Sequence, residues 1–152
     1  MIYLNKTQSG ATRIIALCLA LVLIVPISAN AVESDTIMPL ASYYLDAYSA
    51  YVYVTANGQV QVWFDVMGTG NMDEIGTLTI KLYESTNGTT WTRVETFLHD
   101  STPGMLFYGD DYISSHVSWS GGSTSKQYKA YVCVWAGKNG AGDTRYFWAY
   151  EP

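Results

Sequence analysis

One stretch of regular alternation, residues 127–136 (QYKAYVCVWA), constrains the fold of this chain more than any other. In an extended strand every second side chain falls on the same side, and β-branched and aromatic residues favour that conformation. One side of this stretch is apolar or aromatic throughout, as expected for a strand at the centre of a β-sandwich. Its predicted core face is Tyr128, Ala130, Val132, Val134 and Ala136, and its opposite face is Lys129, Tyr131, Cys133 and Trp135.

Six further segments have the composition of strands and are separated by turn-forming residues. Asn57-Gly58 and Asn87-Gly88 are hairpin signals, and the first is typical of a type I′ turn. No segment after residue 31 has a 3.6-residue period, so we expect no helix there. The prediction is an all-β, seven-stranded antiparallel sandwich. Its strands are expected at residues 43–55, 59–67, 76–84, 91–98, 113–120, 127–136 and 144–150, with Val60, Val62, Phe64, Val66, Leu78, Ile80 and Leu82 facing the core.

Residues 1–31 are typical of a secretory signal peptide. Lys6 and Arg13 lie in the first part, an apolar run follows at residues 14–25, and residues 29–31 (ANA) fit the cleavage rule. A membrane-spanning helix needs roughly 20 apolar residues, so a transmembrane anchor is the weaker alternative. We expect a secreted protein without a carboxy-terminal anchor. Its parts would be a helical signal peptide at 1–31, a flexible segment at 32–40 and a β-sandwich domain at 41–152.

Charge and cysteine content limit the partners of the exported part. After residue 31 the chain has 13 acidic and six basic residues, which is a formal net charge of −7. Such a surface repels phosphate groups, which argues against nucleic acid and anionic membrane as partners. Cys133 is the only cysteine after residue 31, so that part cannot form an internal disulfide. We interpret Cys133 as a small apolar packing residue; a reactive thiol or an intermolecular bridge is the alternative.

Two stretches resemble parts of known extracellular domains. The pattern Tyr128-x-Ala130-x-Val132-x-Val134 resembles the penultimate strand of immunoglobulin and fibronectin type III domains, and residues 85–94 (STNGTTWTRV) resemble a hairpin of many extracellular sandwich modules. The resemblance implies that the Tyr128 hydroxyl bonds to nearby backbone in a tyrosine corner. The Cys-Trp-Cys framework of antibody domains is absent from the sequence, and a shared sandwich implies no shared function.

Further stretches carry a second resemblance: residues 38–45 (MPLASYYL), 62–66 (VWFDV) with 72–75 (MDEI), and 134–138 (VWAGK) with 145–148 (RYFW). Together they resemble a family of short secreted proteins from Gram-positive, clostridia-type bacteria. The resemblance implies export and a β fold. It implies no activity, because that family is a domain of unknown function.

The sequence contains no recognisable catalytic motif. The two histidines, His99 and His116, lie outside any nucleophile-elbow pattern, and we expect both to be structural. Glycoside hydrolysis needs two carboxylates about 5 to 10 Å apart. By composition alone the candidates are Asp65, Asp73, Glu74, Asp110 and Asp111.

Metal binding has little support in the sequence. Zinc sites need clustered cysteine and histidine, and this chain does not have them. Asp100, Asp110 and Asp111 supply oxygen ligands within residues 99–112 and are weak calcium candidates. An ordinary solvated turn is the alternative. We expect no cofactor.

Aromatic residues are more numerous than one small core can hold, with 13 tyrosines, five tryptophans and four phenylalanines. Cross-strand packing would explain many of them, and an exposed platform for a sugar or a protein is the alternative. The best candidate site is Met105, Leu106, Phe107 and Tyr108, because they lie in the longest stretch without periodicity and long loops on sandwiches often carry binding.

Three functions remain open. The leading hypothesis is a secreted, non-enzymatic binding or adhesion module whose partner is an extracellular glycan or protein. The second is a structural protein that associates with itself through an unpaired edge strand, at residues 43–55 or 144–150. The third is a small glycan hydrolase.

Overall fold

The computed structural model describes residues 42–152, and the predicted signal peptide (1–31) and flexible segment (32–40) lie outside this range. The described residues form β strands and loops. Within them, no helix is long and apolar enough to cross a membrane. The strands are β1 (Leu45–Val54), β2 (Val60–Gly68), β3 (Glu74–Ser85), β4 (Thr92–Leu98), β5 (Leu106–Phe107), β6 (Tyr112–Trp119), β7 (Gln127–Lys138) and β8 (Ala141–Tyr150).

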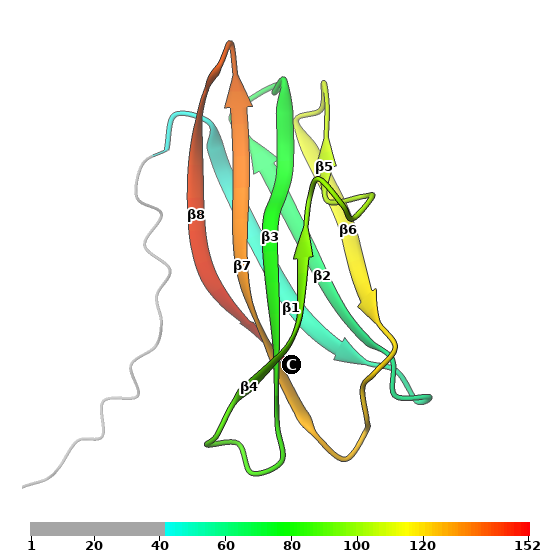
Figure 1. The fold of residues 1–152 in the computed structure, drawn as a ribbon. Helices are drawn as coiled ribbons and strands as arrows, with labels where there is room; N and C mark the ends of the chain where they lie inside the picture. The colour runs from blue at the N-terminus through cyan, green and yellow to red at the C-terminus, as the bar shows by residue number, and fades with distance from the viewer. Residues whose placement is uncertain (1–41) are drawn as a thin grey trace, which may run out of the picture. The chain divides into compact units, whose positions relative to one another are not determined.

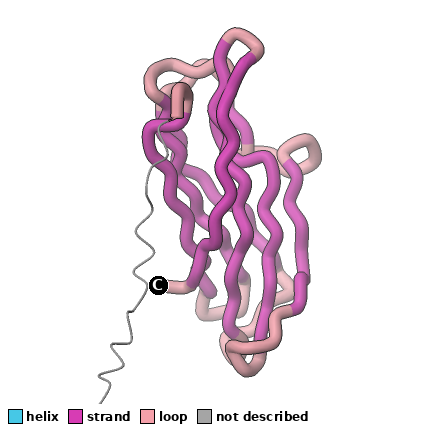
Figure 2. The backbone as a smooth tube through the Cα atoms, turned by 90° about the vertical axis from the view of Figure 1, so that its left-hand side faces the viewer, coloured by secondary structure: helices cyan, strands magenta, loops and turns pink. Residues whose placement is uncertain are grey.

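The strands pair into two antiparallel sheets that form a sandwich-like arrangement (Figure 1). The smaller sheet has the order β1-β2-β6, and the larger has the order β4-β3-β7-β8, with β5 also paired to β3. Figure 2 shows the same strands and their connecting loops from the side. All seven predicted strands are present within a few residues of their expected bounds. The eighth, β5, was not predicted, so the described part is all-β with sheets of three and five strands.

A single hydrophobic core lies between the sheets and follows the predicted alternation. The inward residues of β2 and β7 are at most 2 % exposed. Burying a side chain such as valine or phenylalanine contributes about 1.5–3 kcal/mol, so these two strands supply much of the stability. The confirmed core residues are Val60, Val62, Phe64 and Val66 on β2, Ile80 and Leu82 on β3, and Tyr128, Ala130, Val132, Val134 and Ala136 on β7.

The prediction that Leu78 faces the core is wrong. A β-bulge between Thr77 and Thr79 places one extra residue of β3 against β7, and such an insertion reverses the alternation beyond it. Thr77 is therefore fully buried, while Leu78 lines a hollow on the outer surface of the larger sheet. The Thr77 hydroxyl has no hydrogen-bond partner among the described residues.

The hairpin between β1 and β2 is confirmed, but the predicted type I′ turn at Asn57-Gly58 is wrong. Only the glycine of this pair has a positive φ, at 83°. The Gly58 N–H donates to the Thr55 carbonyl at 2.9 Å. This geometry is that of a type I turn followed by a left-handed glycine.

A type I′ turn lies instead between β7 and β8. Asn139 and Gly140 both have positive φ, 55° and 77°, which is the backbone that this turn requires. Lys138 and Ala141 pair directly across it. Because the connection has only two residues, β7 ends later and β8 begins earlier than the sequence pattern predicted.

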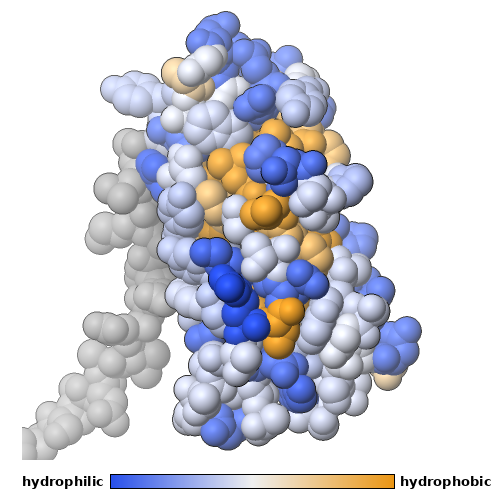
Figure 3. Space-filling view, viewed as in Figure 1, coloured by the Kyte–Doolittle hydropathy of each residue, from blue (hydrophilic) through white to orange (hydrophobic). Residues whose placement is uncertain are grey.

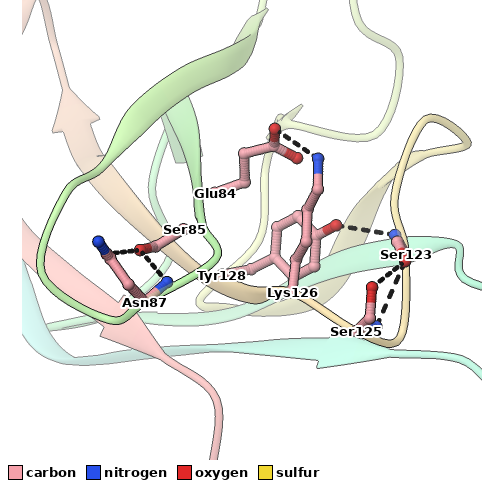
Figure 4. A network of polar contacts seen from close by, with 7 residues as sticks. All are labelled: Glu84, Ser85, Asn87, Ser123, Ser125, Lys126 and Tyr128. Carbon is pink, nitrogen blue, oxygen red and sulfur yellow. Dashed lines mark hydrogen bonds and ion pairs between the residues drawn. The ribbon is translucent and has the colours of Figure 1, made fainter.

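Tyr128 forms the predicted bond between its hydroxyl and nearby backbone (Figure 4). Its ring is 2 % exposed, and its hydroxyl accepts a hydrogen bond from the Ser123 N–H at 2.8 Å. The Lys126–Glu84 ion pair, at 2.7 Å, joins the same loop to the end of β3. The loop that precedes β7 is therefore held against the larger sheet by contacts from both its backbone and its side chains.

Candidate functional site

The four residues predicted to bind a ligand occupy different environments. Met105 is fully buried in the core. Leu106 and Phe107 are half-buried and form β5, which pairs with Ile75 and Gly76 of β3. Tyr108 is 69 % exposed. The fold thus attaches this segment to the larger sheet, and Tyr108 is the member that a ligand can reach fully.

The carboxylates suggested for calcium are not gathered into a site. Asp100, Asp110 and Asp111 are all exposed. The backbone carbonyls of Asp110 and Asp111 accept hydrogen bonds from Met72 and Gly68, which ties their loop to the end of β2. Among residues 42–152, no three histidine, cysteine, aspartate or glutamate side chains come together in a way that could hold a metal ion.

The remaining candidate carboxylates make structural contacts on different parts of the fold. Glu74 accepts a hydrogen bond from the Trp135 indole at 3.2 Å, and Asp73 accepts one from the Asn139 N–H at 2.6 Å. Asp65 lies on the outer face of the smaller sheet, where it accepts hydrogen bonds from Ser49 and Tyr112. These contacts position turns and side chains, and they place Asp65 on a different sheet from Glu74.

The outer face of the larger sheet carries a group of large rings, which we call the aromatic face. Tyr131 of β7 pairs with Trp148 of β8, and in antiparallel strands directly paired side chains lie on the same face. The ring centroid of Tyr131 lies 5.0 Å from that of Trp148 and 6.0 Å from that of Tyr146. The ring centroid of Tyr83 lies 5.4 Å from that of Trp148. The aromatic face comprises Tyr83, Trp91, Tyr131, Tyr146 and Trp148.

This face is open to solvent. Tyr146 and Trp148 are 62 % and 40 % exposed. In Figure 1 the larger sheet is the layer nearest the viewer, and no other layer of described strands covers it. Figure 3, from the same side, shows apolar surface beside strongly hydrophilic side chains on this face. Exposed aromatic and apolar surface with polar neighbours is typical of interaction sites.

Lys129 is built into the aromatic face. Its ammonium group lies 4.4 Å from the ring centroids of both Trp91 and Trp148. A cation over an indole ring is attracted by the electron-rich face of the ring, an interaction worth about 0.5–2 kcal/mol. The side chain is thereby held in one place, and its positive charge is positioned in advance of any ligand.

A hollow of about 370 Å³ lies next to Tyr131 and Tyr146. Cys133 lines it and is 4 % exposed. Burial raises the pKa of the Cys133 thiol, against the opposing influence of a hydrogen bond to Tyr146 and of the nearby Lys81 charge. A thiol that stays protonated at neutral pH is a poor nucleophile, which agrees with a packing role for Cys133.

A second hollow, of about 280 Å³, lies near the beginning of β7 and the end of β8. Trp91 and Tyr150 line it together with Glu151. The aromatic face therefore extends between two depressions, one near Lys129 and one near Cys133. An extended ligand would find shape as well as aromatic surface here.

The outer face of the smaller sheet has a shorter aromatic row. Tyr51, Trp63 and His116 pair across β1, β2 and β6, and their rings stack with centroid distances of 6.4 Å and 4.4 Å. This stacking gives His116 a packing role, as expected from the sequence. The row is flanked by Asp65 and lacks the basic side chains of the aromatic face.

No protein-family model matches this chain, and neither a curated protein nor a solved structure matches it. The fold itself defines the described part as an all-β protein with two antiparallel sheets. The resemblance to a family of short secreted bacterial proteins stays a prediction.

Part of the aromatic face follows from the sequence pattern. Alternation placed Tyr83 and Tyr131 opposite the aliphatic rows, and this outward placement follows from a period of two. The pattern does not connect them with Tyr146 and Trp148, because the pairing of β7 with β8 depends on the turn at Asn139-Gly140.

Proposed function

We propose that this protein is a secreted, non-enzymatic binding module that holds an extracellular ligand on the aromatic face. The observation that carries the proposal is the uncovered row of rings across β3, β7 and β8, with Lys129 fixed between two indoles. Aromatic side chains contribute large contact areas at low entropic cost and dominate the energetics of many binding surfaces.

We further propose that the sandwich is immunoglobulin-like. The orders β1-β2-β6 and β4-β3-β7-β8 support this, because they pair the first, second and sixth strands in one sheet and place the penultimate strand at the centre of the other. The hydroxyl of Tyr128, bonded to backbone five residues upstream, also supports it. In such sandwiches, binding surfaces are added to a rigid scaffold, so the fold suits a binding role without specifying a ligand.

A non-enzymatic role is supported by the positions of the candidate catalytic groups. Asp73 and Glu74 each accept a hydrogen bond that shapes the scaffold, and Asp65 is on the other sheet. A glycan hydrolase would need an acid and a second carboxylate converging on one bond.

The proposal is tested with the exported part, residues 32–152, on arrays of purified bacterial cell walls, polysaccharides and extracellular proteins. Any ligand found should bind Trp148→Ala and Tyr146→Ala at least about tenfold more weakly, the effect of losing an interface hot spot. Tyr53→Ala, from an exposed position of the smaller sheet, is the matched control and should bind normally.

Two results would contradict the proposal. Normal binding by both face variants, with loss in Tyr108→Ala, would move the site to the loop before β6. Release of sugar from any polysaccharide would show an enzyme.

Self-association is a second candidate function, because β1 and β8, the strands expected to serve as edges, do lie at sheet edges. Edge strands have unpaired backbone groups that can pair with another chain. Sedimentation at increasing concentration would test this, and a monomer throughout would remove it.

A further inference from the structure

We propose that the ligand of the aromatic face is an acidic polysaccharide whose carboxylates pair with Lys81 and Lys129 while its sugar rings lie against Tyr131, Tyr146 and Trp148. This inference rests on the proposed function and names the class of ligand for the same surface. Four observations carry it: the charge of the face, its geometry, the kind of groups it exposes, and the contrast with the other sheet.

The aromatic face concentrates positive charge in an acidic protein. The strand pairing places Lys81 beside Tyr131, and Lys129 and Arg93 on either side of Tyr83. The strand pairing places no acidic side chain on this face between the levels of Lys129 and Cys133. Glu74 and Glu151 lie towards its two ends and already accept hydrogen bonds, and the Glu95 carboxylate accepts one from the neighbouring Thr96 N–H on β4.

Neither Lys81 nor Lys129 has a carboxylate partner within the described part of the chain. The ion pair found there joins Lys126 to Glu84, away from the middle of the face. No carboxylate of the described residues therefore neutralises Lys81 or Lys129, although the indole rings of Trp91 and Trp148 hold the Lys129 ammonium in place. An anionic ligand would meet two ammonium groups that no carboxylate neutralises, which favours its approach and its binding.

The spacing suits a repeating ligand. Lys129 and Cys133 are four residues apart on β7, which corresponds to about 13 Å along an extended strand. Two successive outward levels each pair a ring with a positive charge, Tyr83 with Lys129 and Tyr131 with Lys81, and the hollow beside Tyr146 follows at the level of Cys133. A uronic acid polymer has the matching repeat, because each unit combines an apolar C–H face with a carboxylate.

The groups exposed on this face favour a polysaccharide over a peptide. The backbone groups of β3 and β7 are used in pairing with their neighbours, so the face offers side chains only. An extended peptide gains its affinity mainly from backbone pairing at a sheet edge. A sugar polymer needs ring stacking and charged hydrogen bonds, and these are what the aromatic face provides.

The outer face of the smaller sheet provides the internal contrast. Its aromatic row is accompanied by Asp65 and by no lysine or arginine at the paired positions. Aromatic surface alone is thus present on both sheets, whereas the combination of rings with unpaired positive charge is confined to the larger one. Charge, rather than aromatic content, is the feature that selects the ligand.

The inference is tested by calorimetric titration of residues 32–152 with polygalacturonate, alginate and hyaluronate. Fully methyl-esterified polygalacturonate is the matched probe, since it keeps the sugar backbone and removes the charge. We expect at least one of the three acidic polymers to bind, and its affinity to fall as salt is raised from 50 to 500 mM. We expect esterification of polygalacturonate to weaken binding at least tenfold if that polymer binds.

The matched variants are Lys81→Gln and Lys129→Gln, with Lys138→Gln as a control because that ammonium donates to the Asn71 carbonyl outside the face. Each of the first two should weaken binding about two- to fivefold, the range for one solvent-exposed ionic contact, and the double variant should weaken it further. A cooperative unfolding transition shows that each variant is folded, and the midpoint of Lys129→Gln should be somewhat lower because it loses its contacts with Trp91 and Trp148.

Each other outcome overturns the inference in a recognisable way. Equal binding of the acidic and esterified polymers, or normal binding by the double lysine variant, excludes charge recognition. If Trp148→Ala still weakens binding in that case, the proposed binding function survives without charge recognition. If none of the three acidic polymers binds and the arrays identify a neutral ligand, charge recognition is likewise excluded and the proposed binding function survives. Binding to vesicles of anionic lipid through the same lysines would replace the polysaccharide with a membrane.

Discussion

At the scale of single residues, Tyr128 performs two structural tasks. Its ring packs in the core beside Trp119, at a centroid distance of 6.3 Å, and its hydroxyl accepts a hydrogen bond from the Ser123 N–H. A buried tyrosine is stable only where its polar tip has a partner. The loop before β7 provides that partner, so one side chain connects packing of the core with the conformation of a turn.

Replacing Tyr128 by phenylalanine tests the polar task alone. The ring remains, while the Ser123 N–H loses its acceptor, so we expect Tyr128→Phe to lower the free energy of unfolding by about 1 kcal/mol. Urea denaturation measures the change. Tyr150→Phe is the control at a 53 % exposed position and should stay within about 0.5 kcal/mol of the wild type. Equal stability of all three proteins would show that the hydroxyl bond contributes nothing.

At the scale of elements, the edge of β3 decides where the long connection between β4 and β6 lies. The Thr77 N–H donates to the Met105 carbonyl at 2.7 Å, and β5 then pairs with Ile75 and Gly76. Met105 enters the core at this point. A connection that looked like an open binding loop is instead secured to the larger sheet, with Tyr108 left exposed beyond it.

Gly76 makes this approach possible. Its φ is 150°, and a Cβ at this position would lie 2.1 Å from the Met105 carbonyl oxygen. We expect Gly76→Ala to lower the free energy of unfolding by about 1–3 kcal/mol from backbone strain alone, and further because β5 must move. Urea denaturation and hydrogen exchange at residues 105–108 measure the two effects.

Gly70→Ala is the matched control for that substitution, because no atom lies within 4 Å of a Cβ built there. Its stability should stay close to that of the wild type. The same loss in both variants would mean that the close approach of β5 is not what Gly76 provides.

At the scale of the whole molecule, contacts between distant parts of the chain close the fold. Asp143 of β8 accepts hydrogen bonds from the Ser42 hydroxyl and from the N–H groups of Tyr43 and Tyr44, the latter two at 2.8 and 3.1 Å. These partners are about 100 residues away in sequence. The hydrogen bond from Ser42, those from the backbone and the Arg145 charge together lower the pKa of the Asp143 carboxyl.

This lowered pKa predicts a pH dependence of global stability. A carboxylate with a folded pKa below its unfolded value stabilises the fold fully above the unfolded value, and the contribution disappears as pH falls through the folded pKa. Asp143→Asn should therefore be less stable than the wild type at pH 7, and the difference should shrink as pH falls below about 4. Thermal unfolding at several pH values measures it, and a difference that is independent of pH would contradict this role of Asp143.

The strands and their inward faces were predictable, because a period of two is visible in residues such as Val60 to Val66 and Tyr128 to Ala136. Leu78 was misplaced because nothing in the local pattern marks the bulge at Thr77. The Asn139-Gly140 turn could have been found, since this pair is a strong hairpin signal, but the flanking glycines were interpreted as a loop.

The sequence by itself determined the β class, the order of the strands along the chain and most of the side chains that point inward, because these follow from the alternation of neighbouring residues. Only the tertiary structure decided which strands that are not consecutive in the chain are neighbours, such as β2 with β6 and β3 with β7. It thereby decided that Tyr131, Trp148 and Lys129 share one face and that Met105 is buried. The physical reason is that strand pairing and packing depend on contacts between residues far apart in the chain, and these contacts leave no mark in the local pattern.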